Sequence, residues 1–229
     1  MTGIIAHRGF NGLYPENTRR SFEEALKLDI VGIECDVNLT ADGQVAVIHD
    51  LTVDRTSDGS GEVAQMPFDE LRQLNIGTEE DPQQIMLLDE LLDLLEQYPG
   101  KHILIETKHP SPFGAALEEA VADVLRGRGM EADERVHLIS FNPEAIQRFH
   151  RLLPELETFL LADDSFAPVG DCGAGPSVRM AKAHPELLDG RFRTYVWTVN
   201  LPKDMLWLQK HGASLIGTDL PHIALETLV

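Results

Sequence analysis

The sequence predicts an α/β fold in which parallel strands close into a (β/α)₈ barrel. Short apolar segments alternate with helical segments along most of the chain, and such repeats imply parallel strands with helices outside them. About eight strands in a chain of 229 residues favour a closed barrel. Polar residues also recur at the ends of the predicted strands, where a barrel forms its mouth. An open, doubly wound sheet is the alternative fold.

The chain begins with a predicted strand at residues 3–7, which ends in His7-Arg8-Gly9. A helix then runs to about Leu28, and either Asn17 or Thr18 is its expected N-cap. Short polar side chains at that position accept hydrogen bonds from the first free backbone N–H groups of a helix.

The next predicted strand, residues 31–37, looks buried on both faces and yet carries Glu34 and Asp36. Side chains alternate along a strand, so these two acids point the same way and Cys35 points toward the helix layer. Two like charges on a buried face are costly, and a cation between them removes that cost. Carboxylate oxygens suit Mg²⁺ or Ca²⁺. An exposed edge strand with two solvated acids is the alternative.

A hairpin is predicted at Asp42-Gly43, which separates this strand from another at residues 45–49. The connection is too short for a helical crossover. A two-residue loop pairs Ala41 with Gln44 and, counting outward, places Asp36 opposite His49. The hairpin therefore predicts that His49 lies beside the carboxylate pair.

Residues 51–86 are predicted to form a small insertion after the third strand, within a single domain of residues 1–229. The insertion holds a short helix near residues 68–74 and a solvated acidic loop at 79–81. Regular alternation follows, with a Gly/Pro-rich loop before residue 176. The expected helices are 87–97, 114–126, 143–152, 176–183 and 202–211, and the expected strands are 102–108, 136–140, 157–161, 194–198 and 214–217.

Composition limits the partners. The formal net charge of −19 argues against nucleic acid or an anionic membrane, and it means that an anionic substrate needs a local positive centre. No apolar run is long enough to span a bilayer, and the N-terminus lacks a signal-like pattern. Cys35 and Cys172 give no disulfide framework. These features predict a cytoplasmic protein with no membrane partner.

Polar residues at the predicted strand ends converge on one mouth if the barrel closes. They come from the whole length of the chain, and a constellation of this kind is hard to explain by chance. Its members are His7, Arg8, Glu34, Asp36, His49, Glu106, Lys108, Ser140, Trp197 and Asp219.

Ten short motifs in this order resemble the glycerophosphodiester phosphodiesterase family. They run from the first strand to the last, so the resemblance covers nearly the whole chain. One departure is the start of the helix after the insertion, which reads Met86-Leu87-Leu88-Asp89-Glu90 where the family usually has a Pro-Thr-Leu-Glu-Glu-like sequence. The motifs are Ala6-His7-Arg8-Gly9, Pro15-Glu16-Asn17-Thr18, Gly32-Ile33-Glu34-Cys35-Asp36-Val37, Thr40-Ala41-Asp42-Gly43, His49-Asp50, Asp54-Arg55-Thr56, Glu106-Thr107-Lys108, Ser140-Phe141, Val196-Trp197-Thr198-Val199-Asn200 and Gly217-Thr218-Asp219-Leu220-Pro221.

The resemblance implies a TIM barrel of the phospholipase-C-like phosphodiesterase type, and hydrolysis of a small-molecule glycerophosphodiester to sn-glycerol 3-phosphate and an alcohol. It also implies a divalent metal, Mg²⁺ or Ca²⁺. Matched by motif, Glu34, Asp36 and Glu106 hold the metal, and His7 and His49 form the acid–base pair. Arg8 and Lys108 bind phosphate oxygens, and Phe141 and Trp197 wall the pocket.

Other interpretations stay open for individual residues. Glu106 and Lys108 share a face and could form a structural ion pair, Trp197 could be a core aromatic, and His109 is undecided. Asn17 is expected to cap a helix and Asp219 to orient a neighbour. Six histidines are expected at the surface or in packing: His102, His137, His150, His184, His211 and His222.

Two alternative functions stay open, one of them within enzymes and the other in a different class. A related phosphodiesterase acting on lysophospholipids or phosphoinositide-like head groups predicts an apolar lip or a membrane anchor, and the sequence shows neither. A non-catalytic descendant that binds phosphodiesters or metal predicts loss of a histidine or a metal carboxylate, and none is missing. The sequence does not determine the head group, the choice between the two cations or the oligomeric state.

Overall fold

Eight parallel strands follow one another around the computed structural model in the order β7-β6-β5-β4-β2-β1-β9-β8, and the structure describes residues 2–228. Isolated pairs at Ala174–Thr194 and Ser177–Trp197 join β7 to β8, so the barrel is nearly closed. The predicted barrel is confirmed and the open sheet is wrong. The barrel strands are β1 (Gly3–Ala6), β2 (Gly32–Leu39), β4 (His102–Thr107), β5 (Val136–Ser140), β6 (Glu157–Ala162), β7 (Gly173–Pro176), β8 (Tyr195–Val196) and β9 (Leu215–Thr218).

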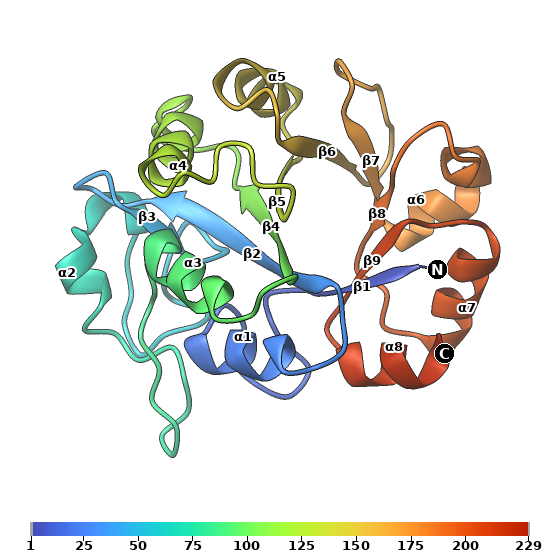
Figure 1. Ribbon diagram of the computed structural model, residues 1–229. Helices are drawn as coiled ribbons and strands as arrows, with labels where there is room; N and C mark the ends of the chain where they lie inside the picture. The colour runs from blue at the N-terminus through green and yellow to red at the C-terminus, as the bar shows by residue number, and fades with distance from the viewer. Residues whose placement is uncertain (1, 229) are drawn as a thin grey trace.

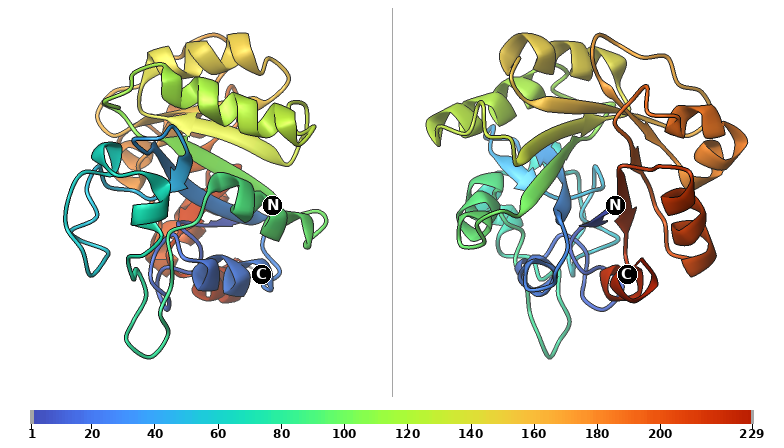
Figure 2. Two further views of the ribbon diagram at one scale, coloured as in Figure 1. Left: turned by 90° about the vertical axis from the view of Figure 1, so that its left-hand side faces the viewer. Right: turned by 45° about the vertical axis from the view of Figure 1, so that its right-hand side comes forward.

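Helices surround the ring of strands (Figure 1). Seen from the side, the segment between β2 and α3 lies beyond one edge of the barrel (Figure 2). The helices are α1 (Arg19–Leu26), α2 (Phe68–Leu71), α3 (Leu88–Glu96), α4 (Ala116–Gly127), α5 (Pro143–Leu152), α6 (Val178–Ala183), α7 (Pro202–Lys210) and α8 (Pro221–Thr227), with 3₁₀ turns at Val63–Gln65 and Pro185–Leu188. The sequence predicted all of these α-helices except α8.

Alternation along the strands creates two apolar layers. One set of side chains packs inside the barrel and includes Ile5, Leu104 and Phe159. The other set faces the helices and includes Ile33 and Cys35, both fully buried. The prediction that Cys35 faces the helix layer is confirmed, and with it the opposite orientation of Glu34 and Asp36.

Strand β3 (Val45–Val47) is not part of the barrel but an antiparallel partner of β2. The predicted hairpin is confirmed, but its register is wrong by one residue. Val37 pairs with Val47, and Ile48 N donates to Asp36 O at 3.0 Å, so Asp36 lies opposite Ile48.

The cause of this register error is the connecting loop, which has three residues because Thr40 N donates to Gln44 O. Gly43 completes the loop with a φ of +77°, a conformation that glycine adopts without strain. Asp42 accepts hydrogen bonds from the Thr40 hydroxyl and from Phe68 N, which ties the loop to the start of α2.

The Gly/Pro-rich segment expected to be a loop contains a barrel strand, β7, so that prediction is wrong. Its sequence is Gly-Ala-Gly-Pro, which has low strand propensity. The neighbouring strand explains it: a Cβ at Gly173 would lie 2.5 Å from the Phe159 ring, and one at Gly175 would lie 2.6 Å from Leu161. Only glycine lets β7 pair closely beside β6.

The insertion has its own small apolar cluster, formed with β3. Val53, Val63, Phe68 and Leu71 are buried in it. The acidic run at 79–81 is exposed, as predicted for a solvated loop.

Gly32 is the position where the barrel tolerates a side chain least. A Cβ there would lie 2.0 Å from the His102 carbonyl oxygen, which belongs to the backbone and has no room to move. Gly32→Ala is expected to lower the free energy of unfolding by about 3 kcal/mol, measured by urea denaturation. The matched control is Gly127→Ala, where a Cβ meets nothing and the helix gains up to about 1 kcal/mol. Equal stability of the two variants would contradict the close approach of β2 and β4.

Candidate active site

Three buried carboxylates lie together on β2 and at the carboxyl end of β4. The parallel register places Asp36 beside Glu106, and Glu34 precedes Asp36 on the same face. One oxygen from each acid lies within 4.8 Å of the other two. Glu34 Oε1 and Asp36 Oδ1 are buried without a hydrogen-bond partner. Unpartnered hard oxygen donors in this arrangement fit a divalent cation.

Two cationic side chains border this cluster. Arg8 Nε lies 3.1 Å from Asp36 Oδ2, and the Arg8 backbone N–H donates to Glu34 Oε2 at 3.0 Å. Lys108 contacts Glu106 through a short ion pair and lies 3.4 Å from Asp36 Oδ1. The Glu106–Lys108 ion pair considered from the sequence therefore exists, but it lies within the acidic cluster.

Arg8 reaches two acids at once because its backbone is left-handed, with a φ of +55°. This conformation is uncommon for residues other than glycine, and such outliers cluster at functional sites. Gly9 follows with a φ of +77°, and a Cβ there would lie 2.7 Å from the Ser21 backbone carbon. The turn after β1 thus presents both the backbone N–H and the guanidinium of Arg8 to the acids.

Asn17 has a role that the sequence interpretation missed. The N-cap of α1 is Thr18, whose side chain accepts from Ser21 N, so the expectation that Asn17 caps the helix is wrong. Asn17 is instead buried, and its Nδ2 donates to Asp36 Oδ2 at 2.9 Å. Like Arg8, it has a left-handed backbone, with a φ of +56°.

The pKa values of the three acids diverge. Burial alone would raise the pKa of Asp36, but Lys108 and Arg8 lower it to about 2. Burial and the Asp36 charge raise the pKa of Glu106 to about 7, against the opposing effect of Lys108. Burial, followed by repulsion from Asp36 and Glu106, raises the pKa of Glu34 well above its usual range. A cation bound here competes with protons for these oxygens.

His7 is held by an acid from the last strand. Its Nδ1 lies 2.7 Å from Asp219 Oδ1, and Asp219 also accepts from Asn11 Nδ2 at 3.1 Å and Asn200 Nδ2 at 2.6 Å. Asp219 thus lies where an orienting residue must lie. This pairing leaves Nε2 of His7 as the ring nitrogen available to a substrate.

His49 reaches the site although β3 has the other register. The strand ends at Val47, and Asn38 Nδ2 donates to the carbonyl oxygens of Ile48 and His49 at 2.9 and 3.2 Å. These bonds hold the chain in a bend, and His49 enters the cavity beyond it. Burial lowers the pKa of His49 despite the nearby Asp36 charge.

A relay of ion pairs connects His49 with Arg8. His49 Nδ1 contacts Asp50, and Asp50 binds Arg55 Nε at 2.6 Å. Arg55 also donates to Glu16 at 2.7 and 2.9 Å, and Glu16 accepts from Arg8 at 2.9 Å. Arg55 belongs to the insertion, so the insertion is fastened to both sides of the site.

A cavity of about 170 Å³ opens among these groups. Asp36 lies behind its wall, fully buried. Of the nine residues with predicted roles, the other eight line the cavity: His7, Arg8, Glu34, His49, Glu106, Lys108, Phe141 and Trp197.

Aromatic side chains form the remaining wall. Phe141 and Trp197 pack edge to face with centroids 5.1 Å apart, and Trp197 Nε1 donates to Gly175 O at 2.7 Å. Trp197 therefore both packs and lines the cavity. Tyr195 also lines it and was not predicted, and its buried hydroxyl has no hydrogen-bond partner. Alternation along β8 places Tyr195 and Trp197 on one face, which is the signal that could have found it.

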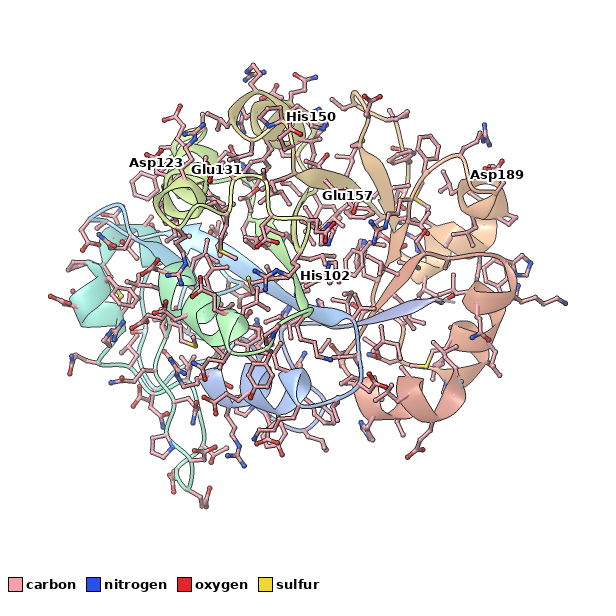
Figure 3. The ribbon with its side chains drawn as sticks, viewed as in Figure 1. His102, Asp123, Glu131, His150, Glu157 and Asp189 are labelled. Atoms are coloured by element: carbon pink, nitrogen blue, oxygen red, sulfur yellow. The ribbon has the colours of Figure 1, made fainter. Side chains whose placement is uncertain are left out.

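Other polar clusters lie away from this cavity. A larger cavity of about 630 Å³ is lined by Arg72, Gln83 and Glu90, and no residue with a predicted role borders it. His102 and Glu157 lie near the starts of β4 and β6, with His150 on α5 (Figure 3). His102 and His137 stack at 5.2 Å, and none of the six histidines expected elsewhere lines the cavity.

The arrangement suits a particular class of enzyme. Cations beside an acidic, cation-binding cluster can hold an anionic ester, and histidines at the same cavity can move protons. The class is a barrel hydrolase of phosphoric diesters. The chain belongs to the glycerophosphoryl diester phosphodiesterase family, whose model matches residues 7–223.

Known proteins are similar to this chain over nearly its whole length. It is 33% identical to "Probable glycerophosphodiester phosphodiesterase 1" of Mycobacterium tuberculosis, over 95% of this chain and 89% of that protein. It is 32% identical to a glycerophosphodiester phosphodiesterase of Bacillus altitudinis, over 99% and 98%. An Oleispira antarctica phosphodiesterase, solved with the product sn-glycerol-3-phosphate, superposes with a TM-score of 0.89 at 26% identity and covers 100% of this chain and 97% of that one. Within residues 2–228, no helix has the length and apolar composition to cross a membrane.

Glu34 generates a prediction about stability. The cluster buries the carboxyl group of Glu34 beside two other acids, so without metal it must either carry a further like charge or bind a proton, and the isosteric amide removes that cost. Without added metal, Glu34→Gln is expected to raise the free energy of unfolding by about 1 kcal/mol. The rise in Tm that Mg²⁺ or Ca²⁺ induces should disappear. Glu79→Gln, on the exposed loop, is the control, and a metal-induced Tm rise that survives in Glu34→Gln would contradict the site.

Arg55 generates a second prediction, as a positioning residue for His49. Arg55→Gln leaves Asp50 and Glu16 without their shared partner, so phosphodiesterase kcat is expected to fall about tenfold, because small misplacements of reacting groups cost up to about 100-fold. Tm should change little, since Arg55 is half-exposed. Arg20→Gln, an exposed arginine on α1, is the control. A kcat equal to that of the control would remove the relay from the mechanism.

Proposed function

We propose that the protein hydrolyses glycerophosphodiesters to sn-glycerol 3-phosphate and an alcohol, with Mg²⁺ or Ca²⁺ held by Glu34, Asp36 and Glu106. One observation carries this proposal: carboxylates with unpartnered oxygens and two histidines meet at the same cavity. Each histidine also contacts an acid outside the cluster, His7 with Asp219 and His49 with Asp50. The product complex of the Oleispira antarctica neighbour supports the same substrate class.

Charge explains why a cation and a diester suit this site together. The three acids outnumber Arg8 and Lys108, so the ionised cluster repels an anion. A bound divalent cation reverses the sign, and it supplies polarisation of a phosphoryl oxygen and charge screening. The reversal matters in a chain with a net charge of −19, which repels anions at long range.

Arg8 and Lys108 have different tasks at the phosphate. Arg8 offers a planar fork that can serve two oxygens, and Lys108 acts as a point charge. Both also contact the acidic cluster, which limits their freedom before the substrate arrives. Phe141 and Trp197 form an apolar wall for the glycerol carbons.

His7 and His49 act as the acid–base pair. One removes the proton from the attacking hydroxyl, and the other protonates the leaving alcohol oxygen. In the proposed sequence, the glycerol hydroxyl next to the phosphate attacks first, and water then opens the cyclic phosphate. Asp219 and Asp50 fix the orientation of the two rings.

The remaining parts of the proposal concern organisation and location. Residues 1–229 act as one domain, and residues 51–86 are a small insertion that completes the mouth. The substrate is a small molecule. Cys35 and Cys172 are free and buried, as suits a cytoplasmic protein.

The deciding experiment measures release of glycerol 3-phosphate from glycerophosphocholine in a coupled assay, with EDTA and then with Mg²⁺ or Ca²⁺ restored. Activity is expected to vanish with EDTA and return with one of the ions. His49→Ala should lose roughly 100-fold or more in kcat and keep the metal-induced rise in Tm. Activity that persists in EDTA would overturn the metal proposal, and full activity of His49→Ala would remove His49 from the mechanism.

A further inference from the structure

A second cavity meets the first at two of its most important residues. His49 and Lys108 line both the 170 Å³ cavity and a cleft of about 400 Å³. A phosphodiester has two ester arms on one phosphorus atom. If the phosphate lies between Arg8 and Lys108, the small cavity holds one arm and the cleft is the space open to the other. The cleft is lined by His49, Asp50, Leu51, Thr52, Lys108, His109 and Pro110.

Every charged or polar side chain of the cleft already has a partner in the protein. Asp50, the carboxylate of the cleft, is neutralised by Arg55, and Lys108 is assigned to the phosphate, so neither is left to bind a charged head group. The pairs are His49 with Asp50, Asp50 with Arg55, Thr52 with Asp54, Lys108 with Glu106, and His109 with Glu118.

The groups left unpaired in the cleft are apolar. Leu51 is 41% exposed, and Pro110, on the loop after β4, lines the same cleft. Leu51 is not isolated: among residues 2–228, five of the six exposed large apolar side chains lie on strand-to-helix connections around the mouth. These are Leu13, Leu51, Phe113, Phe141 and Leu201, and the sixth, Leu206, lies on α7.

The sequence alone showed no apolar lip. The five residues are far apart in the sequence, and only the closed barrel brings their loops to one end. Isolated surface leucines are normal, but Phe141 lines the small cavity and Leu51 lines the adjoining cleft, and exposed apolar side chains at such a place indicate a ligand surface.

We propose that the cleft lined by Leu51 and Pro110 is the subsite for the leaving alcohol, and that it favours uncharged alkyl or aryl alcohols over charged head groups. The inference rests on the proposed function and specifies its substrate class. Leu51 is the specificity-determining residue, because it is the exposed apolar side chain that lines both the cleft and its rim.

The cleft also assigns the proton transfers. The C2 hydroxyl oxygen of glycerol bonds to phosphorus and gives its proton to His7, which borders only the small cavity. The bond from phosphorus to the alcohol oxygen breaks, and that oxygen takes a proton from His49, which borders the cleft. The alcohol leaves through the cleft, and water then opens the cyclic phosphate with the two histidine roles reversed.

The test compares soluble glycerophosphodiesters of ethanol, butanol and hexanol with glycerophosphocholine. Full burial of a methylene group raises affinity about fourfold. In an open cleft each methylene gains about half of that free energy, which corresponds to about a twofold increase in affinity. From ethyl to hexyl, kcat/KM is therefore expected to rise about 16-fold, and the hexyl ester should exceed glycerophosphocholine. Leu51→Asn should flatten the ratio of hexyl to ethyl kcat/KM to about twofold. Leu206→Asn, an equally exposed leucine away from the mouth, should keep the wild-type ratio.

Each outcome separates the inference from the proposed function. A flat chain-length profile in an active wild-type enzyme would overturn the subsite and leave the phosphodiesterase function standing. A rise that persists in Leu51→Asn would place the alkyl group elsewhere. Failure to hydrolyse any of the esters, with either cation present, would overturn the proposed function itself.

Discussion

The structure depends on one electrostatic constraint: three carboxylates are buried within 4.8 Å of one another at the end of two adjacent strands. Burying like charges together is among the most costly arrangements in a protein, unless protons, cations or hydrogen bonds compensate them. Here the compensation is incomplete. Arg8 and Lys108 offset the charge of Asp36, and Glu34 receives one backbone N–H, but each acid keeps one oxygen without a hydrogen-bond partner. A divalent cation can compensate the negative charge that remains.

Much of the surrounding backbone serves this cluster. The turn after β1 takes a left-handed conformation at Arg8 and Gly9, and Asn17 takes another before α1. Such a backbone costs stability at Arg8 and Asn17, which are not glycines, and both residues gain a contact with a buried acid in return. The two histidines at the cavity are also held by acids, His7 by Asp219 and His49 by Asp50. The opposite end of the barrel shows the contrast, because His102, His137 and Glu157 stack and pair there without bordering the cavity.

Sequence patterns predicted the barrel and the polar strand ends because both depend on local information. Alternation along β2 was enough to put Glu34 and Asp36 on one face. The pairing of β2 with β4 then places Glu106 beside Asp36. The predictions that failed concern features that depend on contacts between residues distant in the sequence. Strand β7 exists because two glycines fit against Phe159 and Leu161, and the three-residue loop that sets the register of β3 is tied by Asp42 to Phe68 in the insertion. Asn17 and Arg55 stood in recognised motifs, but their partners lie 19 and 39 residues away from them in the chain.

The insertion therefore contributes more to the site than its weak sequence pattern suggests. It supplies Arg55, which pairs with both the Arg8 side and the His49 side of the cavity, and Leu51, which lines the adjoining cleft. Barrel strands fix the acids and the phosphate-binding cations, and these positions tolerate little change because their charges are interdependent. The connections that form the cleft carry fewer buried charges, and an apolar side chain there can vary in size without disturbing the acids. Different segments of the chain therefore form the cleft and the charged cavity. Head-group preference can change through the cleft while the reaction in the cavity stays the same.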